Sequence, residues 1–210
     1  MTSLPPADGE VGTGAHERSD HHLRETIVAT EVLHRGHYLT FRIDTVERAD
    51  GTRAQREICG HPGAVAILAL DADDRVLLVR QWRTAAGGTL VEIPAGTLDV
   101  DPTTGEIEDH ASAAPRELEE ETGQRAGSWR HLTSFWTAPG FATELMHLYL
   151  ATDLRPAHED RLGPDEDERL ELVRMPWPEA VRAVERGEFA DAKSILGLLW
   201  LARLRAADDV

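Results

Sequence analysis

Three glutamates in one short segment have the spacing of neighbours on a helix. Glu117, Glu120 and Glu121 lie three and four positions apart, so on a helix their side chains share one face. Like charges at this spacing repel, so the arrangement is either tolerated on a solvated surface or used to hold a hard cation. Cations such as Mg²⁺ take carboxylate oxygens as ligands. The segment is therefore a candidate metal-binding site.

The surrounding sequence predicts the helix that these glutamates need. From Ala111 to Thr122 the residues are mostly Ala, Leu, Arg and Glu, and Gly123 follows, as expected at a helix C-cap. Pro115 lacks a backbone donor, so the helix either begins late, with Pro115 in its first turn, or is kinked in its first turns.

The other segments predict a mixed α/β (α+β) protein. Ala64–Leu70 is a continuous apolar run, and Val76–Val79 follows a turn at Asp71–Asp74, so we expect two buried central strands. Strands and helices are mixed without a regular alternation, which favours an α/β sandwich over a doubly wound sheet. The remaining expected elements are strands Thr26–Ala29, Tyr38–Ile43, Arg56–Ile58, Leu90–Pro94, Leu132–Trp136, Leu145–Ala151 and Leu170–Met175, and helices Pro178–Arg186 and Asp191–Leu204.

Length and composition predict one main domain with two N-terminal additions. The chain has 210 residues, of which 41% are hydrophobic, enough to bury one substantial core. Residues 1–22 are rich in Gly, Pro, Asp, Glu and His and lack the order of a signal peptide, so we expect a mobile tail. Residues 23–60 are expected to form an antiparallel β-meander, and residues 61–210 the main domain.

The charge of the chain argues against several classes of partner. It has 38 acidic and 22 basic residues, a formal charge of -16, so nucleic acid and anionic membranes would be repelled over most of its surface. No apolar run approaches the roughly 20 residues that span a bilayer. Cys59 is the only cysteine, which excludes an intrachain disulfide and fits a reducing cytoplasm. The ten histidines show no metal-ligand spacing.

The glutamates lie within a longer motif. Arg116 to Gly123 matches R-E-U-x-E-E-x-G, where U is apolar, and Glu108 lies eight positions before Arg116. Together with Gly96, these residues resemble the signature of Nudix hydrolases, which implies a Nudix α/β/α sandwich with a mixed central sheet and the meander. Two features differ from that signature: eleven residues rather than five separate Gly96 from Glu108, and Gln124 takes the final apolar position. The first is an insertion in a loop, where added length is tolerated.

Further segments, from Val32 to Leu204, resemble the ADP-ribose pyrophosphatase branch of these enzymes. They are Gly63–Ile67, Arg80–Arg83, Pro139, Gly187–Phe189, Ala192–Ile195 and Trp200. The resemblance implies hydrolysis of ADP-ribose to AMP and ribose 5-phosphate, a small-molecule nucleotide as the partner, and Mg²⁺ or Mn²⁺ as the cofactor. In this branch N-terminal strands are commonly exchanged between subunits, so a homodimer is also implied.

The resemblance assigns roles to individual residues. Metal ligands would be Glu117, Glu120, Glu121 and the carbonyl of Ala95, with Arg116 orienting the glutamates. In the acidic segment before the last strand, Glu166 would be the general base and Glu168 a further ligand, or both could belong to a solvated acidic loop. Glu144 is a second candidate base.

Substrate contacts are implied at five positions. Arg83 is the best candidate for a phosphate or ribose contact, because a guanidinium supplies two parallel donors, and Arg56 is a weaker one. Glu92, in the segment that leads to Gly96, is a further candidate. Tyr38 and Phe41 could stack on adenine or could simply be core residues.

Three other functions remain open from the sequence. The chain could act on another nucleotide sugar such as GDP-mannose, on a dinucleotide or on a damaged nucleotide. It could bind ADP-ribose-like molecules as a sensor without hydrolysis, although it retains the carboxylates that such proteins tend to lose. It could also be a calcium-stabilised domain, if the match to the motif is chance.

Overall fold

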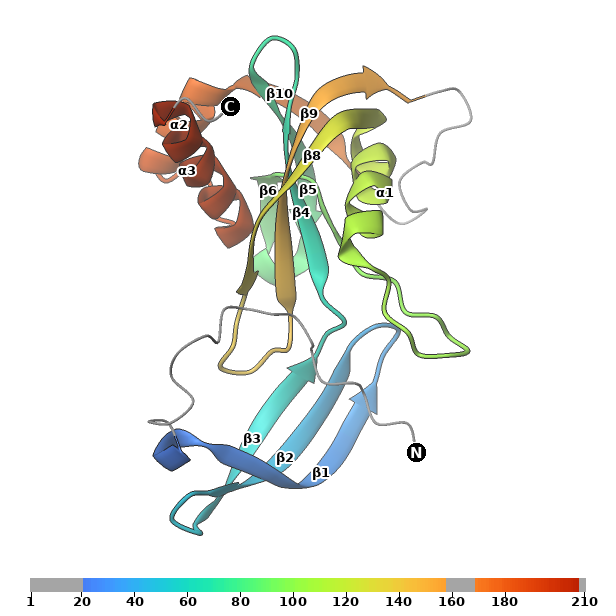
Figure 1. Ribbon diagram of the computed structural model, residues 1–210, viewed down its shortest axis with the longest axis vertical. Coiled ribbons are helices and arrows are strands. Elements are labelled where there is room, and N and C mark those ends of the chain that lie inside the picture. Colours follow the sequence, from blue (N-terminus) through green and yellow to red (C-terminus); the bar gives the residue numbers. More distant parts are fainter. Residues whose placement is uncertain (1–20, 158–168, 208–210) are drawn as a thin grey trace. The chain divides into compact units, whose positions relative to one another are not determined.

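The computed structural model describes residues 21–157 and 169–207, which divide into two compact units (Figure 1). Unit 1 contains the described residues up to Gly63, together with Asp99–Ile107 and Ser134–Leu145. Unit 2 contains Ala64–Leu98, Glu108–Thr133 and the described residues from Met146 onward.

A mixed seven-stranded sheet forms the framework of unit 2. Its strands follow the order β10-β5-β4-β9-β8, with β6 paired to β5 and β7 paired to β4. Strand β4 runs parallel to β9 and antiparallel to β5 and β7. The strands are β4 (Ala64–Leu70), β5 (Arg75–Arg83), β6 (Gly88–Glu92), β7 (Ala95–Thr97), β8 (Gln124–Trp136), β9 (Leu145–Pro156) and β10 (Glu171–Pro176).

Both faces of β4 are covered, which is why this strand is apolar throughout. All seven of its residues are buried. On one face they pack with helix α1 (His110–Thr122) in a cluster that includes Leu118. On the other face a Cβ at Gly197 of α3 (Ala192–Ala206) would lie 4.0 Å from Leu68 Cδ1 of β4, so that helix packs there. Helix α2 (Trp177–Glu185) lies beside α3, opposite α1 (Figure 1). The expected α/β/α sandwich is confirmed.

Helix α1 ends where the sequence predicts but begins earlier. Gly123 has a left-handed backbone (φ 66°), and its N–H donates to Glu119 O at 2.9 Å, which confirms the C-cap. The helix begins at His110, so Pro115 lies inside it rather than in the first turn. The alternative of a late start was therefore wrong, because backbone bonds from Ser112 and Ala113 to Asp109 O already close the first turn.

Unit 1 is built on an antiparallel sheet of three strands in the order β1-β2-β3. The strands are β1 (Glu25–Arg35), β2 (Thr40–Arg48) and β3 (Arg53–Gly60), which confirms the predicted meander with longer strands. The described chain also has two 3₁₀ turns, η1 (His21–Leu23) and η2 (Thr84–Ala86). Every residue of β1 is exposed, and its large apolar side chains are Ile27, Val28, Val32 and Leu33.

Several strand limits differ from the prediction. Strand β8 begins at Gln124 rather than Leu132. The sequence did not indicate its first half, because those residues are largely exposed and show little apolar patterning. Strand β6 ends at Glu92 rather than Pro94, since proline has no N–H to donate to a neighbouring strand. Strand β2 begins at Thr40, so Tyr38 precedes it. Among the described helices, none has both the length and the apolar character that a membrane crossing requires.

Candidate active site

The carboxylates of α1 face the short strand β7. Glu117 lies so close to Gly96 that a Cβ at position 96 would be 1.9 Å from Glu117 Cδ. Glu121 Oε2 accepts a hydrogen bond from the Ala95 N–H at 3.0 Å. Glu117 and Glu121 are each 8% exposed, so both carboxylates are held in a largely buried space. Gly96 is therefore required for the close approach of helix and strand.

Arg116 connects three of the acidic side chains. Its Nη2 donates to Glu108 Oε2 at 2.7 Å, and its Nη1 donates to Glu117 Oε1 and Glu120 Oε2, each at 2.8 Å. The hydrogen bond with Glu108 and the charges of the two helix glutamates raise the pKa of Arg116 against the effect of burial. The guanidinium therefore stays charged and limits the orientations of these carboxylates.

The segment between β6 and β7 is fixed from both sides. The Ile67 N–H of β4 donates to Pro94 O at 2.8 Å, and Val65 is paired with Gly96 in the sheet. Together with the bond from Ala95 N–H to Glu121, these contacts hold the backbone of residues 94–96 against α1. A carbonyl ligand at Ala95 would need such a fixed backbone.

The chemistry of these groups fits a hard divalent cation. Carboxylate and carbonyl oxygens are the ligands that Mg²⁺ and Mn²⁺ prefer, and a carboxylate that accepts one hydrogen bond, as Glu117 and Glu120 do from Arg116, still has lone pairs for a cation. Within residues 21–157 and 169–207, no three His, Cys, Asp or Glu side chains already converge as a metal site. The residues that would hold a cation are Glu117, Glu120, Glu121 and the carbonyl of Ala95.

A second charged cluster lies at the end of β6. Glu92 is 1% exposed and accepts from Arg83 Nε at 3.0 Å, Arg83 Nη2 at 2.7 Å and Lys193 Nζ at 2.7 Å. Burial raises the pKa of Glu92, but the hydrogen bond from Arg83 and the charge of Lys193 outweigh it, so the pKa lies below its usual value. The Arg83 side chain is 40% exposed and can reach a ligand in solution.

The remaining candidate substrate residues belong to unit 1. Arg56 Nε donates to Glu25 Oε2 at 3.0 Å. Tyr38 and Phe41 are 53% and 46% exposed, so neither is a core residue. Phe41 and Phe141 line a pocket of about 260 Å³ in this unit.

The two candidate bases, Glu144 and Glu166, and the further candidate ligand Glu168 come from different segments. Glu144, in unit 1, accepts from Thr137 Oγ1 at 2.5 Å, and its Oε1 lies 3.6 Å from His61 Nε2. Glu166 and Glu168 lie outside the described residues.

The sequence analysis missed a cluster of aromatic titratable groups in unit 2. The rings of His110 and His147 are stacked with centroids 3.9 Å apart, and His131 lies 6.0 Å from His147. His110 Nδ1 is 2.5 Å from the Tyr149 hydroxyl. These residues come from α1, β8 and β9, so no spacing in the sequence could have indicated their proximity.

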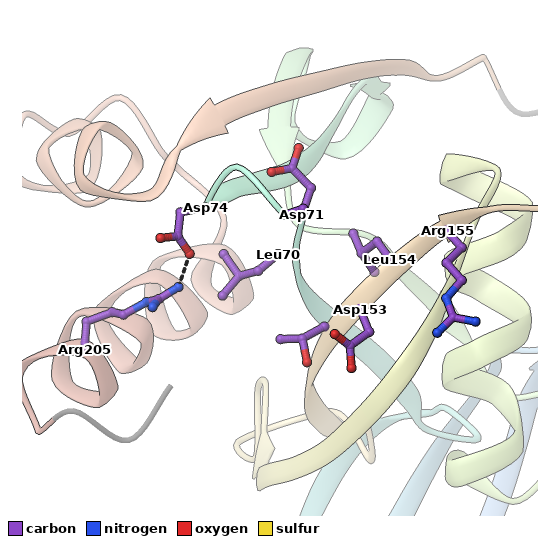
Figure 2. Close-up of a pocket in the computed structure, with 9 residues that line it drawn as sticks. Leu70, Asp71, Asp74, Asp153, Leu154, Arg155 and Arg205 are labelled. Atoms are coloured by element: carbon purple, nitrogen blue, oxygen red, sulfur yellow. Dashed lines mark hydrogen bonds and ion pairs between the residues drawn. The ribbon is translucent and has the colours of Figure 1, made fainter.

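A separate pocket in unit 2 does not belong to the carboxylate site. Its volume is about 430 Å³, and its lining comes from the ends of β4 and β9 and from α3. Figure 2 shows Arg205 hydrogen-bonded to Asp74 on one side of the pocket, and Asp153 and Arg155 on the other side. None of the predicted site residues lines this pocket.

Comparison with known proteins identifies the family. Residues 60–197 match the model of the NUDIX domain. The chain is 38% identical over 179 residues to the ADP-ribose pyrophosphatase of Bacillus subtilis, covering 85% of this chain and 93% of that protein. It is 40% identical over 172 residues to the ADP-ribose pyrophosphatase of Mycobacterium tuberculosis, covering 82% and 80%. A crystal structure of an ADP compounds hydrolase superposes with a TM-score of 0.73 at 26% identity, covering 89% of this chain and 97% of that one. The chain therefore belongs to the Nudix family.

Proposed function

We propose that the protein hydrolyses the pyrophosphate bond of ADP-ribose in a reaction that depends on a divalent metal ion. The observation that carries this proposal is the set of carboxylates, Glu117, Glu120 and Glu121, on the helix face that packs against residues 95–96. The ADP-ribose pyrophosphatases among the relatives support the choice of substrate.

The reaction breaks one P–O bond of the pyrophosphate. The oxygen of a water molecule attacks a phosphorus atom, its proton passes to a general base, and the products are AMP and ribose 5-phosphate. Mg²⁺, or Mn²⁺ in its place, would neutralise phosphate charge and acidify the water when bound. Glu117, Glu120, Glu121 and Ala95 would hold it, and Glu168 would add a ligand.

Among the other acidic and basic groups, we assign two further roles. Arg116 keeps Glu117 and Glu120 in place through its paired hydrogen bonds. The proton of the attacking water is taken by Glu166, with Glu144 as the second candidate.

For substrate binding we assign the phosphates or ribose to Arg83 and, more weakly, to Arg56. Exposure of the guanidinium supports Arg83, whose donors can pair with phosphate oxygens. Tyr38 and Phe41 are exposed aromatic side chains on which adenine could stack. Glu92 is almost completely buried, so we assign it to the support of Arg83.

We also infer that the protein forms a homodimer and works in the cytoplasm. The dimer is supported by β1, which presents Ile27, Val28, Val32 and Leu33 to solvent. Exposed apolar side chains in such number on one strand are typical of a surface that another subunit covers.

Product analysis with a panel of substrates tests the function. Purified protein would be given Mg²⁺ and ADP-ribose, ADP-glucose, GDP-mannose, diadenosine polyphosphates or nucleoside triphosphates, with EDTA as the control. We expect metal-dependent release of AMP, with the highest kcat/KM for ADP-ribose. Faster turnover of another compound would keep the chemistry and change the substrate. Binding of ADP-ribose without any turnover would indicate a sensor.

A further inference from the structure

The only lysine in the sequence is buried beside the candidate site. Lys193 is one of 22 basic residues, and the other 21 are arginines. Its side chain is 10% exposed, less than that of any arginine in an ion pair of the described structure. A lysine ammonium is a compact point charge with three donors on a flexible stem, whereas a guanidinium is a rigid planar fork. The buried cation at this position is therefore one that can donate to several carboxylates in different directions.

Lys193 bridges two carboxylates from different parts of the chain. Its Nζ lies 2.7 Å from Glu92 Oε2 and 3.0 Å from Asp191 Oδ1. Asp191 also caps α3, because its Oδ2 accepts from the Ser194 N–H at 3.0 Å. The ammonium thus links the first turn of α3 to the end of β6, because Lys193 and Glu92 are in contact although 101 positions separate them in the sequence.

Ser194 makes a second link between the same two elements. Its Oγ accepts from the buried Ile93 N–H at 2.8 Å and donates to Asp191 Oδ2 at 2.5 Å. Ser194 is completely buried, so both of its bonds are shielded from water. We call this set, formed by Asp191, Lys193 and Ser194 with Glu92 and Ile93, the α3 clasp.

The α3 clasp holds two parts of the candidate site. Glu92 binds Arg83 through Nε and Nη2, so the Nη1 side of that guanidinium is not committed to Glu92. Ile93 leads directly into residues 94–96, whose backbone contacts β4 and Glu121. A displacement of Glu92 or Ile93 would therefore be transmitted to Arg83 and to the Ala95–Gly96 backbone.

The charges of the α3 clasp balance only when Lys193 is present. With Arg83 included, two cations face the carboxylates of Glu92 and Asp191. Without Lys193, the buried Glu92 would retain Arg83 as its one described cationic partner, and Asp191 would lose its ammonium contact. The Glu92 carboxylate would then bind Arg83 more tightly, and an anionic ligand would have to compete with Glu92 for the same guanidinium.

We propose that Lys193 and Ser194 are positioning residues that hold Glu92 and Ile93 and thereby orient Arg83 and the Ala95–Gly96 backbone toward the phosphates of a nucleotide. This inference rests on the proposed function, since it assumes that those phosphates are bound beside the α1 carboxylates. Neither residue touches the substrate in this scheme.

The test compares Lys193→Met with Arg203→Met. Both remove one positive charge from α3, but Arg203 is exposed in the last turn and lies outside the α3 clasp. Binding of ADP-ribose is measured by calorimetry in EDTA, which prevents turnover, and kcat and KM are then measured with Mg²⁺. For Lys193→Met we expect Kd and KM to rise about 10- to 100-fold, the usual effect of losing a residue that supports a site. Arg203→Met should match the wild type within about twofold, well below that effect.

A double-mutant cycle tests whether Lys193 acts through Glu92. Lys193→Met is measured alone and together with Glu92→Gln. If the proposal is correct, the second substitution weakens binding much less once the first is present, because both disrupt one network. Independent, multiplying effects on Kd would overturn it, as would wild-type binding by Lys193→Met.

A second variant covers the case in which Lys193→Met does not fold. Ser194→Ala removes the bond to Ile93 and leaves the ion pairs, so it should weaken ADP-ribose binding with the Lys193–Glu92 contact intact. Wild-type affinity in that variant would contradict the proposal. If the wild-type protein hydrolyses no compound of the panel, the proposed function fails, while the Kd measurement still tests the α3 clasp because it needs no turnover.

Discussion

Glu119 accepts two hydrogen bonds from Arg125, at 2.6 Å from Nε and 2.7 Å from Nη2. Glu119 belongs to the same acidic run as Glu120 and Glu121, yet it is directed to a different partner. Because residues two apart on a helix point to nearly opposite sides, Glu119 cannot share the face of Glu117 and Glu121. The acidic run therefore contains one structural carboxylate next to the three candidate ligands.

We predict that Glu119→Gln mainly lowers stability, whereas Glu120→Gln mainly lowers activity. Glu119→Gln weakens a charge-assisted pair whose arginine is half exposed, so it should lower the unfolding free energy by about 0.5–1 kcal/mol, with kcat nearly unchanged. Glu120→Gln should lower kcat by several orders of magnitude with little change in Tm, and Glu121→Gln should do the same to kcat. Wild-type activity in both of the latter variants would contradict the assignment of the metal ligands.

We predict that Gly96→Ala strongly lowers the activity of the site. The added methyl group would overlap the Glu117 carboxyl, so the carboxylate or the backbone must move. A forced shift of this kind costs about 1–3 kcal/mol of stability, and loss of a correctly placed ligand should lower kcat/KM by about 100-fold. Gly88→Ala is the matched control, because a Cβ there meets nothing within 4 Å. Equal kcat/KM values for the two variants would show that Glu117 tolerates the displacement.

We predict that His147 makes the protein less stable in acid. Burial first, and then the charges of His110 and His131, lower the pKa of His147 to about 4, against an opposing effect of Asp109. Tyr149, whose own pKa is raised by burial, lies against the His110 ring in the same cluster.

The sign of the effect follows from proton binding. Below its ordinary pKa of 6.5, His147 takes up a proton in the unfolded chain but stays neutral in the folded one until about pH 4. The contribution of His147 to the free energy of unfolding is fully present above pH 6.5. It is lost as the pH falls from 6.5 to about 4, by an amount on the order of 2 kcal/mol. Urea unfolding at several pH values should show a flatter pH dependence for His147→Gln than for the wild type. The exposed His34→Gln should keep the wild-type slope.

We predict that charges on β1 dissociate the homodimer. Light scattering of the wild type should give about twice the chain mass of 23.2 kDa. The double variant Ile27→Glu/Val32→Glu should give the mass of one chain, because two carboxylates would be buried in an apolar interface. Leu199→Glu, at an exposed apolar position of α3, serves as the control. A wild-type protein with the mass of one chain would contradict the dimer.

Local patterns were sufficient to predict the helix of the glutamates, its glycine C-cap and the buried strand β4. These features depend on neighbours within a few positions, such as the three- and four-residue spacing of the carboxylates. The same patterns left the limits of β8 wrong, because a half-exposed strand carries little hydrophobic periodicity. They also could not decide whether α1 began before Pro115.

The tertiary structure alone decided which distant residues meet. Lys193 and Glu92 are 101 residues apart, and His110, His131 and His147 come from three different elements. No local spacing encodes such contacts, because they arise only when the packing of helices on the sheet brings separate segments together. The sequence by itself thus determined the carboxylate chemistry, whereas the fold determined what holds those carboxylates and Arg83 in place.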